Sequence, residues 1–359
     1  MKFSSFSHVW NKPGMTAAER YEELWRELAL CDEMGFDYGF AVEHHFSPHE
    51  SWMPSPPVYC AGGAARTRRM RLGPMGYVVP LYDPIRIVEE VAVLDQVLNG
   101  RLEVGLVSGI VPSYFGPYKA DFENRRALAN EGLALIKAAF ASDGPFSFDG
   151  PYHQYRDVKL SVKPVQKPHP PLWMQSRDPD TLEFLAKEGV HTGYLLFMPR
   201  EDVAPRYREY LRLWREAGHR QKPNIGYWTL VHVDETDEKA VATATPYILH
   251  AFSQVFGFGD TGGINQWELA ENYVKRGELG AAEIARNMTN VDYLLKRNVV
   301  FVGSPETVAR RIREAAEEGL FNTVFCEFNL GWMSDEELMR SIRLFGAEVI
   351  PALRDFEPY

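Results

Sequence analysis

The chain has 359 residues, of which 45% are hydrophobic and 25% charged, and its formal net charge at pH 7 is −10. These proportions are ordinary for a globular protein, and this length allows two domains or one large α/β barrel. The acidic balance offers no basic face for nucleic acid, and no 18-residue apolar run predicts a membrane span.

The cysteines and the N-terminal stretch indicate the cellular compartment in which the protein is expected. The three cysteines, Cys31, Cys60 and Cys326, are widely scattered and have no metal-type spacing, which favours reduced thiols. The opening stretch lacks the apolar core of a signal peptide. We therefore expect a cytoplasmic protein that contacts neither nucleic acid nor membrane.

Strand-like and helix-like segments alternate from the first residues. Helical patterns occupy 17–35, 56–69, 84–100 and 124–141, and strand patterns occupy 2–10, 36–46, 70–80 and 101–109. Pro84 opens the third of these helices and Gly100 closes it, which matches the usual asymmetry of helix ends.

The alternation pauses at 144–166, where turns and aromatics predict a hairpin or excursion. It then resumes, with strands expected at 170–176, 190–198, 223–235 and 321–331 and helices at 178–189, 201–218, 237–256, 304–319 and 334–353. Residues 257 to about 300 fit no barrel period. They begin with a glycine-rich turn and continue with a helical Ala/Glu pattern, which predicts a second excursion.

Eight strand–helix pairs without a linker predict parallel βαβ units in a single domain over residues 1–359. A (β/α)8 TIM barrel with insertions near 144–166 and 257–300 is the most economical α/β fold. A doubly wound open sheet is the alternative. No Gly-x-Gly-x-x-Gly follows the first strand, which disfavours it.

The stretch "FAVEHHFSPHE" (40–50) places Glu43, His44 and His45 where an apolar strand ends. In a barrel, functional groups gather at the carboxyl ends of the strands. Adjacent strand residues point to opposite faces, so the two histidines cannot easily share one ion, and we predict no metal site. Acid–base chemistry and a purely structural Glu–His contact both remain open.

Two further stretches indicate a ligand. Gly76 stands mid-strand in "LGPMGYVVPLYDPIR" (72–86), where a glycine usually marks a close backbone approach. In "QSRDPDT" (175–181), Ser176 and nearby amides can face an anion at a helix N-terminus, or Ser176 or Asp178 can simply cap that helix. Arg125 and Arg126 in "NRRAL" (124–128) can reach the same anion.

In these motifs the chain resembles the bacterial luciferase-like, flavin-dependent monooxygenases. The resemblance covers most of the chain and rests on "EHHFSP", "RLGPMGYVVPLYDPIRIVEEVAVLDQVLNGRLEVGLVSG", "FENRRALANEGLALI", "PPLWMQS" and "VGSPETVARRIREAAEEG". Within the family, single-chain monooxygenases of small hydrophobic substrates, including limonene-monooxygenase-like members, look most similar.

The resemblance implies that reduced FMN binds at the barrel mouth, forms a C4a-peroxyflavin with O2, and oxygenates a small hydrophobic substrate. His44 matches the catalytic histidine, flanked by Glu43 and His45. Met75-Gly76 matches a non-prolyl cis peptide beneath the flavin ring. The other implied cofactor-binding residues are Ser108, Arg126, Gln175, Ser176, Arg177 and Thr181, with Arg126, Ser176 and Thr181 at the phosphate.

The resemblance also has limits and consequences. Val107 stands where luciferase has a reactive cysteine, which argues against light emission. A separate flavin reductase and a homodimer are implied, and an F420-dependent hydride-transferring reductase or a non-catalytic flavin-binding protein are the alternatives.

Residues 257–300 are predicted to form a mobile lid, or else a rigid packing element. Aromatic strand ends are expected to exclude water: Trp10, Tyr77, Trp173, Tyr227, Trp228 and Phe328.

Overall fold

The computed structural model describes residues 1–255 and 265–359. The first part of the chain forms β1 (Lys2–Ser7), α1 (Ala17–Glu33), β2 (Tyr38–Ala41), α2 (Pro56–Ala64), β3 (Arg71–Pro74), β4 (Tyr77–Val78), η1 (Val79–Leu81), α3 (Pro84–Val97), β5 (Val104–Val107), η2 (Pro112–Tyr114), α4 (Phe115–Tyr118) and α5 (Arg125–Ala141). Local chemistry sets the helix starts. In α1, Thr16 and Glu19 form a capping box, and in α3, Asp83 caps the helix ahead of Pro84.

The second part begins with β6 (Phe146–Asp149) and β7 (Gln154–Val158). It continues with β8 (Leu172–Met174), α6 (Pro179–Glu188), β9 (Thr192–Leu195), α7 (Arg200–Glu216), β10 (Ile225–Val233), α8 (Asp237–Val255), α9 (Gln266–Lys275), α10 (Leu279–Arg286), α11 (Val291–Lys296), β11 (Phe301–Gly303), α12 (Pro305–Gly319), β12 (Thr323–Glu327), α13 (Asp335–Leu344), a π-helical turn (Phe345–Val349) and α14 (Ile350–Leu353).

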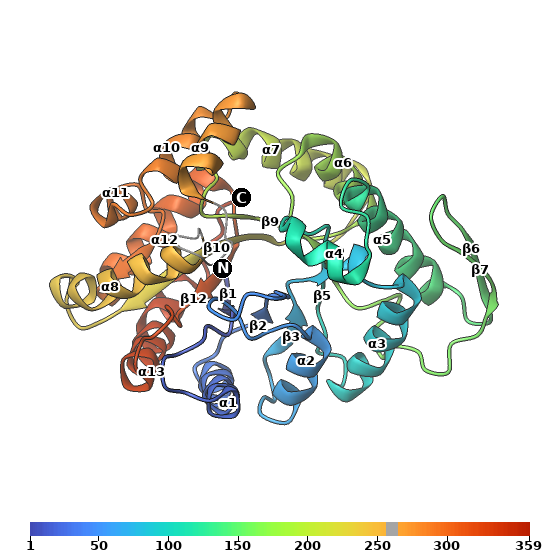
Figure 1. Cartoon of the computed structure of the whole chain (residues 1–359), viewed down its shortest axis with the longest axis horizontal. Helices are drawn as coiled ribbons and strands as arrows, with labels where there is room; N and C mark the ends of the chain where they lie inside the picture. The colour runs from blue at the N-terminus through green and yellow to red at the C-terminus, as the bar shows by residue number, and fades with distance from the viewer. Residues whose placement is uncertain (256–264) are drawn as a thin grey trace.

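The strands form a curled parallel sheet surrounded by helices (Figure 1). The larger sheet has the order β11-β10-β12-β1-β2-β3, with β9 also paired to β10, and the smaller sheet has the order β4-β5-β8. Isolated parallel bridges join Leu72 to Leu102 and Trp173 to His191. The first places β3 beside the residues that precede β5, and the second places β8 beside those that precede β9, so the two sheets adjoin at two places.

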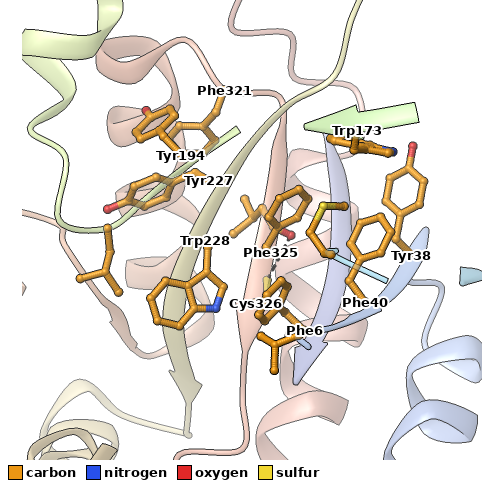
Figure 2. Close-up of a cluster of buried hydrophobic side chains, with 14 of the residues drawn as sticks. Phe6, Tyr38, Phe40, Trp173, Tyr194, Tyr227, Trp228, Phe321, Phe325 and Cys326 are labelled. Atoms are coloured by element: carbon orange, nitrogen blue, oxygen red, sulfur yellow. Dashed lines mark hydrogen bonds between the residues drawn. The ribbon is translucent and has the colours of Figure 1, made fainter. Parts of the chain in front are cut away.

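Aromatic side chains fill the interior of the curl (Figure 2). Trp173 of β8 lies edge-on to Phe40 of β2 and to Phe325 of β12, with ring centroids 5.8 and 5.6 Å apart. Phe6 of β1 stacks on Phe325 at 6.0 Å. Rings from strands distant in sequence therefore meet across the sheet, and their burial stabilises its curvature.

The predicted alternation of strands and helices is confirmed, and so is the parallel α/β class. The hairpin expected within 144–166 is present, because β6 and β7 pair antiparallel and project from the body of the molecule (Figure 1). The strands are shorter than predicted. The sequence also missed β11, since Phe301–Gly303 is too short to show any periodicity.

The stretch 257–300 is helical in its described part, as α9, α10 and α11. The glycine-rich turn at 257–263, on which the predicted lid motion depends, lies outside the described residues. Cys31, Cys60 and Cys326 are buried free thiols. Across residues 1–255 and 265–359, no helix combines the length and apolar character that crossing a membrane requires.

Candidate active site

The residues predicted for the site gather at one edge of the sheet, because parallel strands bring their carboxyl ends together. Glu43, His44 and His45 follow β2, and Met75 and Gly76 lie between β3 and β4. The others follow β5 or β8 or lie in the first turns of α5 and α6: Ser108, Arg126, Gln175, Ser176, Arg177 and Thr181.

His44, the predicted catalytic residue, is only partly buried. Its Nδ1 lies 2.9 Å from Oε1 of Glu50, and 22% and 12% of the two side chains are exposed. The atoms are within ion-pair distance, but the contact lacks the alignment of a hydrogen bond. Burial raises the pKa of Glu50, but the imidazole of His44, and more weakly that of His8, outweigh it and lower the pKa.

His8, just beyond the end of β1, lies edge-on to His44 with the ring centroids 5.2 Å apart. Its Nδ1 lies 2.7 Å from Oε2 of Glu327, and its backbone N–H donates to Oε1 of the same carboxylate at 3.0 Å. Burial lowers the pKa of His8, but Glu327, with a smaller contribution from Glu50, outweighs it and raises the pKa.

Glu327 at the end of β12 also fixes two indole rings. The Nε1 groups of Trp10 and Trp228 donate to it at 3.0 and 3.3 Å, and the Glu327 side chain is fully buried. Both indoles contact the ring of His8. One carboxylate thus holds an imidazole and two tryptophans in a fixed wall beside His44.

Glu43 points to the opposite side of the loop from His44. Its Oε1 lies 2.8 Å from Nε2 of His45 and accepts from the hydroxyl of Tyr82 at 2.9 Å, and its Oε2 accepts the backbone N–H of Val78 at 2.9 Å. His45 also lies 3.1 Å from the hydroxyl of Tyr118, through Nδ1. The neighbouring histidines therefore face different partners, as alternation along an extended segment predicts.

Gly76 confirms the close backbone approach predicted for it. A Cβ built at Gly76 would lie 2.4 Å from the carbonyl carbon of Gly105, and one at Gly105 would lie 2.4 Å from the carbonyl oxygen of Pro74. The Met75–Gly76 peptide bond is cis, which matches the geometry that the resemblance implies.

The turn after β8 is capped by its own side chains. Asp178 accepts from the backbone N–H of Thr181 at 3.0 Å and from its hydroxyl at 2.9 Å, and Ser176 Oγ accepts from the N–H of Asp178 at 3.1 Å. The structure therefore shows the capping alternative for Asp178, whereas Ser176 bonds the N–H of this capping residue and not one of the helix. Thr181 directs both of its donors to Asp178.

Arginines surround this turn. Burial raises the pKa of Asp178, but its bonds from Thr181 and then the charges of Arg126 and Arg206 outweigh it and lower the pKa. Arg177 turns away, because its guanidinium lies 3.0 Å from Oε2 of Glu278 and over the ring of Tyr273. Arg126 is exposed and lies close enough to Asp178 for its charge to act on that carboxylate.

Within the described part of the chain, His8, His44 and Glu50 bring possible metal-ligand atoms within 4.8 Å of one another. The sequence predicted no metal site, because His44 and His45 point to opposite faces and the other strand ends supply no second carboxylate cluster. Among the residues that the structure describes, no such grouping involves His45, whose two ring nitrogens lie beside Glu43 and Tyr118.

The sequence also missed several residues of the site. Glu50 lies within the stretch 40–50. A spacing of six residues from His44 does not bring two side chains into contact on a regular strand or helix. Glu50 and Arg206 were not predicted, whereas His8 and Glu327 were recognisable as strand-end residues but received no role. Glu50 lies in the loop after β2 and Arg206 lies within α7, where a charged side chain by itself is no signal of a site.

Of the aromatic residues expected to exclude water, Trp10 and Trp228 lie at the site. Trp173 lies deeper, because its Nε1 donates to Glu103 at the amino end of β5 at 2.6 Å. Tyr227 stacks on Phe321, with ring centroids 4.8 Å apart. Tyr77 and Phe328 pack elsewhere, against Tyr82 and Phe36 respectively, among other residues. The expected wall is therefore smaller than the sequence suggested.

A family model described as luciferase-like monooxygenase matches residues 1–323. The chain belongs to this family. It is 25% identical over 361 residues to the alkanal monooxygenase alpha chain of Photobacterium leiognathi, covering 99% of each chain. It is 25% identical over 364 residues to the oxygenase component of the flavin-dependent trigonelline monooxygenase of Acinetobacter baylyi, covering 99% of this chain and 96% of that one.

Solved structures share the fold. Monooxygenase RslO1 of Streptomyces bottropensis has a TM-score of 0.78 at 23% identity, covering 98% of this chain and 99% of that one. The oxygenating constituent of 3,6-diketocamphane monooxygenase of Pseudomonas putida, solved with FMN, has a TM-score of 0.78 at 20% identity, covering 98% of each. An F420-dependent secondary alcohol dehydrogenase has a TM-score of 0.70 at 17% identity, covering 99% of each.

Proposed function

We propose that this luciferase-like monooxygenase uses reduced FMN and O2 to oxygenate a small hydrophobic organic substrate. Bound reduced FMN would supply the electrons that activate O2. The observation that supports the proposal most is the position of His44. It is a partly buried imidazole at the carboxyl end of β2, beside a wall fixed by Glu327. There it can take or give a proton while the indoles of Trp10 and Trp228 limit the entry of water.

The residues at the sheet edge suit a flavin ring. Gly76 and Gly105 leave no room for side chains between them, so the backbones of 74–76 and 105–106 lie close together at this edge. Ser108 lies at the end of β5, on the same edge. We place Met75, Gly76, Ser108 and Gln175 around the ring. Glu43 and His45 would act on it indirectly, by holding the backbone of Val78.

For the phosphate, we favour Arg126 and Ser176, with Arg206 as an added cation. Asp178 caps α6 and places a negative charge at this turn, so the phosphate would lie on the Arg126 side of it. Thr181 would contribute through the shape of the turn. Arg177 would have to leave Glu278 to reach the phosphate.

The remaining parts of the proposal concern architecture and partners. We propose that the bridges at Leu72–Leu102 and Trp173–His191 close the sheet into a (β/α)8 barrel, and that residues 1–359 form one domain. A relative described as an oxygenase component supports a separate flavin reductase as the source of reduced FMN. We also propose a homodimer.

Binding and oxidation measurements with two cofactors test the proposed function. The purified protein is titrated with FMN and with F420, and O2 uptake and hydrogen peroxide release are then followed after adding reduced FMN. We expect saturable binding of FMN, and oxidation of bound flavin that differs in rate from free flavin. Binding of F420 alone, with hydride transfer and no O2 uptake, would identify a reductase. FMN binding with no effect on its oxidation would identify a non-catalytic flavin-binding protein.

A further inference from the structure

Glu50 lies on the loop that follows β2, and the loop folds back so that its carboxylate meets His44. The backbone N–H of His44 donates to the carbonyl of Met53 at 3.0 Å, and that of Glu50 donates to the carbonyl of Ser47 at 3.0 Å. These bonds fix the loop on both sides of Glu50. The result is a carboxylate 2.9 Å from Nδ1 of His44, with only 12% of its side chain exposed.

A second imidazole, that of His8, lies near this carboxylate just beyond the end of β1. Glu327 holds Nδ1 of His8 at 2.7 Å, which places the proton of the neutral ring on Nδ1 and leaves Nε2 for other partners. The ring of His8 stands at 87° to that of His44. In its protonated form this ring contributes to the lowered pKa of Glu50. Glu327, His8, Glu50 and His44 thus alternate between acidic and basic groups from β12 to the end of β2.

We propose that Glu50 is the positioning residue of His44, with the ring of His8 packed edge-on against that imidazole. The inference rests on the proposed function, since it assigns a partner to the catalytic histidine. A carboxylate at Nδ1 selects the tautomer with its proton on Nδ1, so Nε2 is the atom that takes or gives a proton. Glu50 stabilises the imidazolium by its charge, and no proton passes to the carboxylate.

The surrounding groups fit this assignment. His44 faces Glu50, the ring of His8 and the ring of Tyr114, whose centroid lies 5.9 Å away. The Glu50 carboxylate faces His44 and His8, and a hydrogen bond from Ser47 also lowers its pKa. His8 faces Glu327 and Glu50. The Nδ1–Oε1 contact is close but not aligned, which is common for catalytic pairs before the ligand binds.

The tautomer of His44 in the flavin-free protein tests the inference without any activity. Nitrogen-15 NMR of histidine-labelled protein at pH 8 distinguishes the two ring nitrogens, and His44→Ala identifies the His44 signals. We expect wild-type His44 to be protonated on Nδ1, and Glu50→Gln to shift it to a mixture of tautomers. His49→Gln, an exposed residue of the same loop, should change nothing. An unchanged tautomer in Glu50→Gln would overturn the positioning role.

Kinetics separate this inference from the proposed function. Glu50→Gln should lower kcat by about 10-fold or more with KM within about 2-fold, and Glu50→Asp should recover part of the loss. In a His44→Ala background, Glu50→Gln should have no further effect, because its partner is gone. If the tautomer responds as expected and no oxygenation is found, the proposed function fails and the pairing stands. A stoichiometric metal ion that Glu50→Gln releases would overturn the pairing and make the cluster a metal site.

Discussion

The Glu43 carboxylate lies 2.8 Å from Nε2 of His45 and reaches the backbone N–H of Val78 with its other oxygen. This carboxylate therefore joins the end of β2 to β4, and it does not act on His44. We expect Glu43→Gln to lower the free energy of unfolding by about 1–3 kcal/mol, because one amide hydrogen would face a donor. Urea denaturation measures this. Glu89→Gln, an exposed change on α3, is the control, and an equally small effect in both would contradict the assigned role.

His44→Ala should reduce product formation by about 100-fold or more, which is the usual scale for an acid–base residue. Flavin affinity should stay within a few-fold, since His44 contacts Glu50 and the rings of His8 and Tyr114. Single-turnover assays and fluorescence titration give the two quantities. Unchanged turnover would remove His44 from the mechanism.

Arg126→Ala and Ser176→Ala should weaken FMN more than riboflavin, because a contact to a charged phosphate contributes about 1.5–3 kcal/mol. Arg125→Ala is the matched control in the same helical turn, since Arg125 lies over the ring of Phe122 and donates to its carbonyl at 2.8 Å. Titration with both flavins gives the ratio. Equal losses for FMN and riboflavin would place the phosphate elsewhere.

The contribution of Glu27 should make the free energy of unfolding fall as the pH rises. Burial, only partly offset by Arg20, raises the pKa of this carboxyl to about 7. Between about pH 4.5 and 7 the unfolded chain releases this proton while the folded protein keeps it, so the folded state loses on the order of 3 kcal/mol. Glu27→Gln removes that loss. Its free energy of unfolding relative to wild type should therefore be higher at pH 8 than at pH 5, and parallel pH profiles would contradict the assignment.

Gly76→Ala and Gly105→Ala should each destabilise the fold by roughly 3 kcal/mol or more, since the added methyl groups would collide with rigid backbone. Gly144→Ala is the control, because a Cβ there meets nothing within 4 Å. Thermal denaturation compares the three variants. A melting temperature of Gly76→Ala equal to that of Gly144→Ala would show that the two strands can separate without cost.

The sequence by itself determined the alternation of strands and helices and the strand end that carries His44. Both are local properties, because periodicity and capping involve residues that are consecutive in the chain. The close approach at Gly76 was predictable for the same reason, since a glycine within a strand is itself a signal.

Only the tertiary structure decided which partner each group has. Residues His8 and Glu327 are 319 positions apart, and only the curling of the sheet brings β1 and β12 side by side. Likewise, the conformation of the loop after β2 pairs Glu50 with His44 and Glu43 with His45. Sequence spacing cannot encode such contacts, because they depend on how strands and loops far from one another pack together.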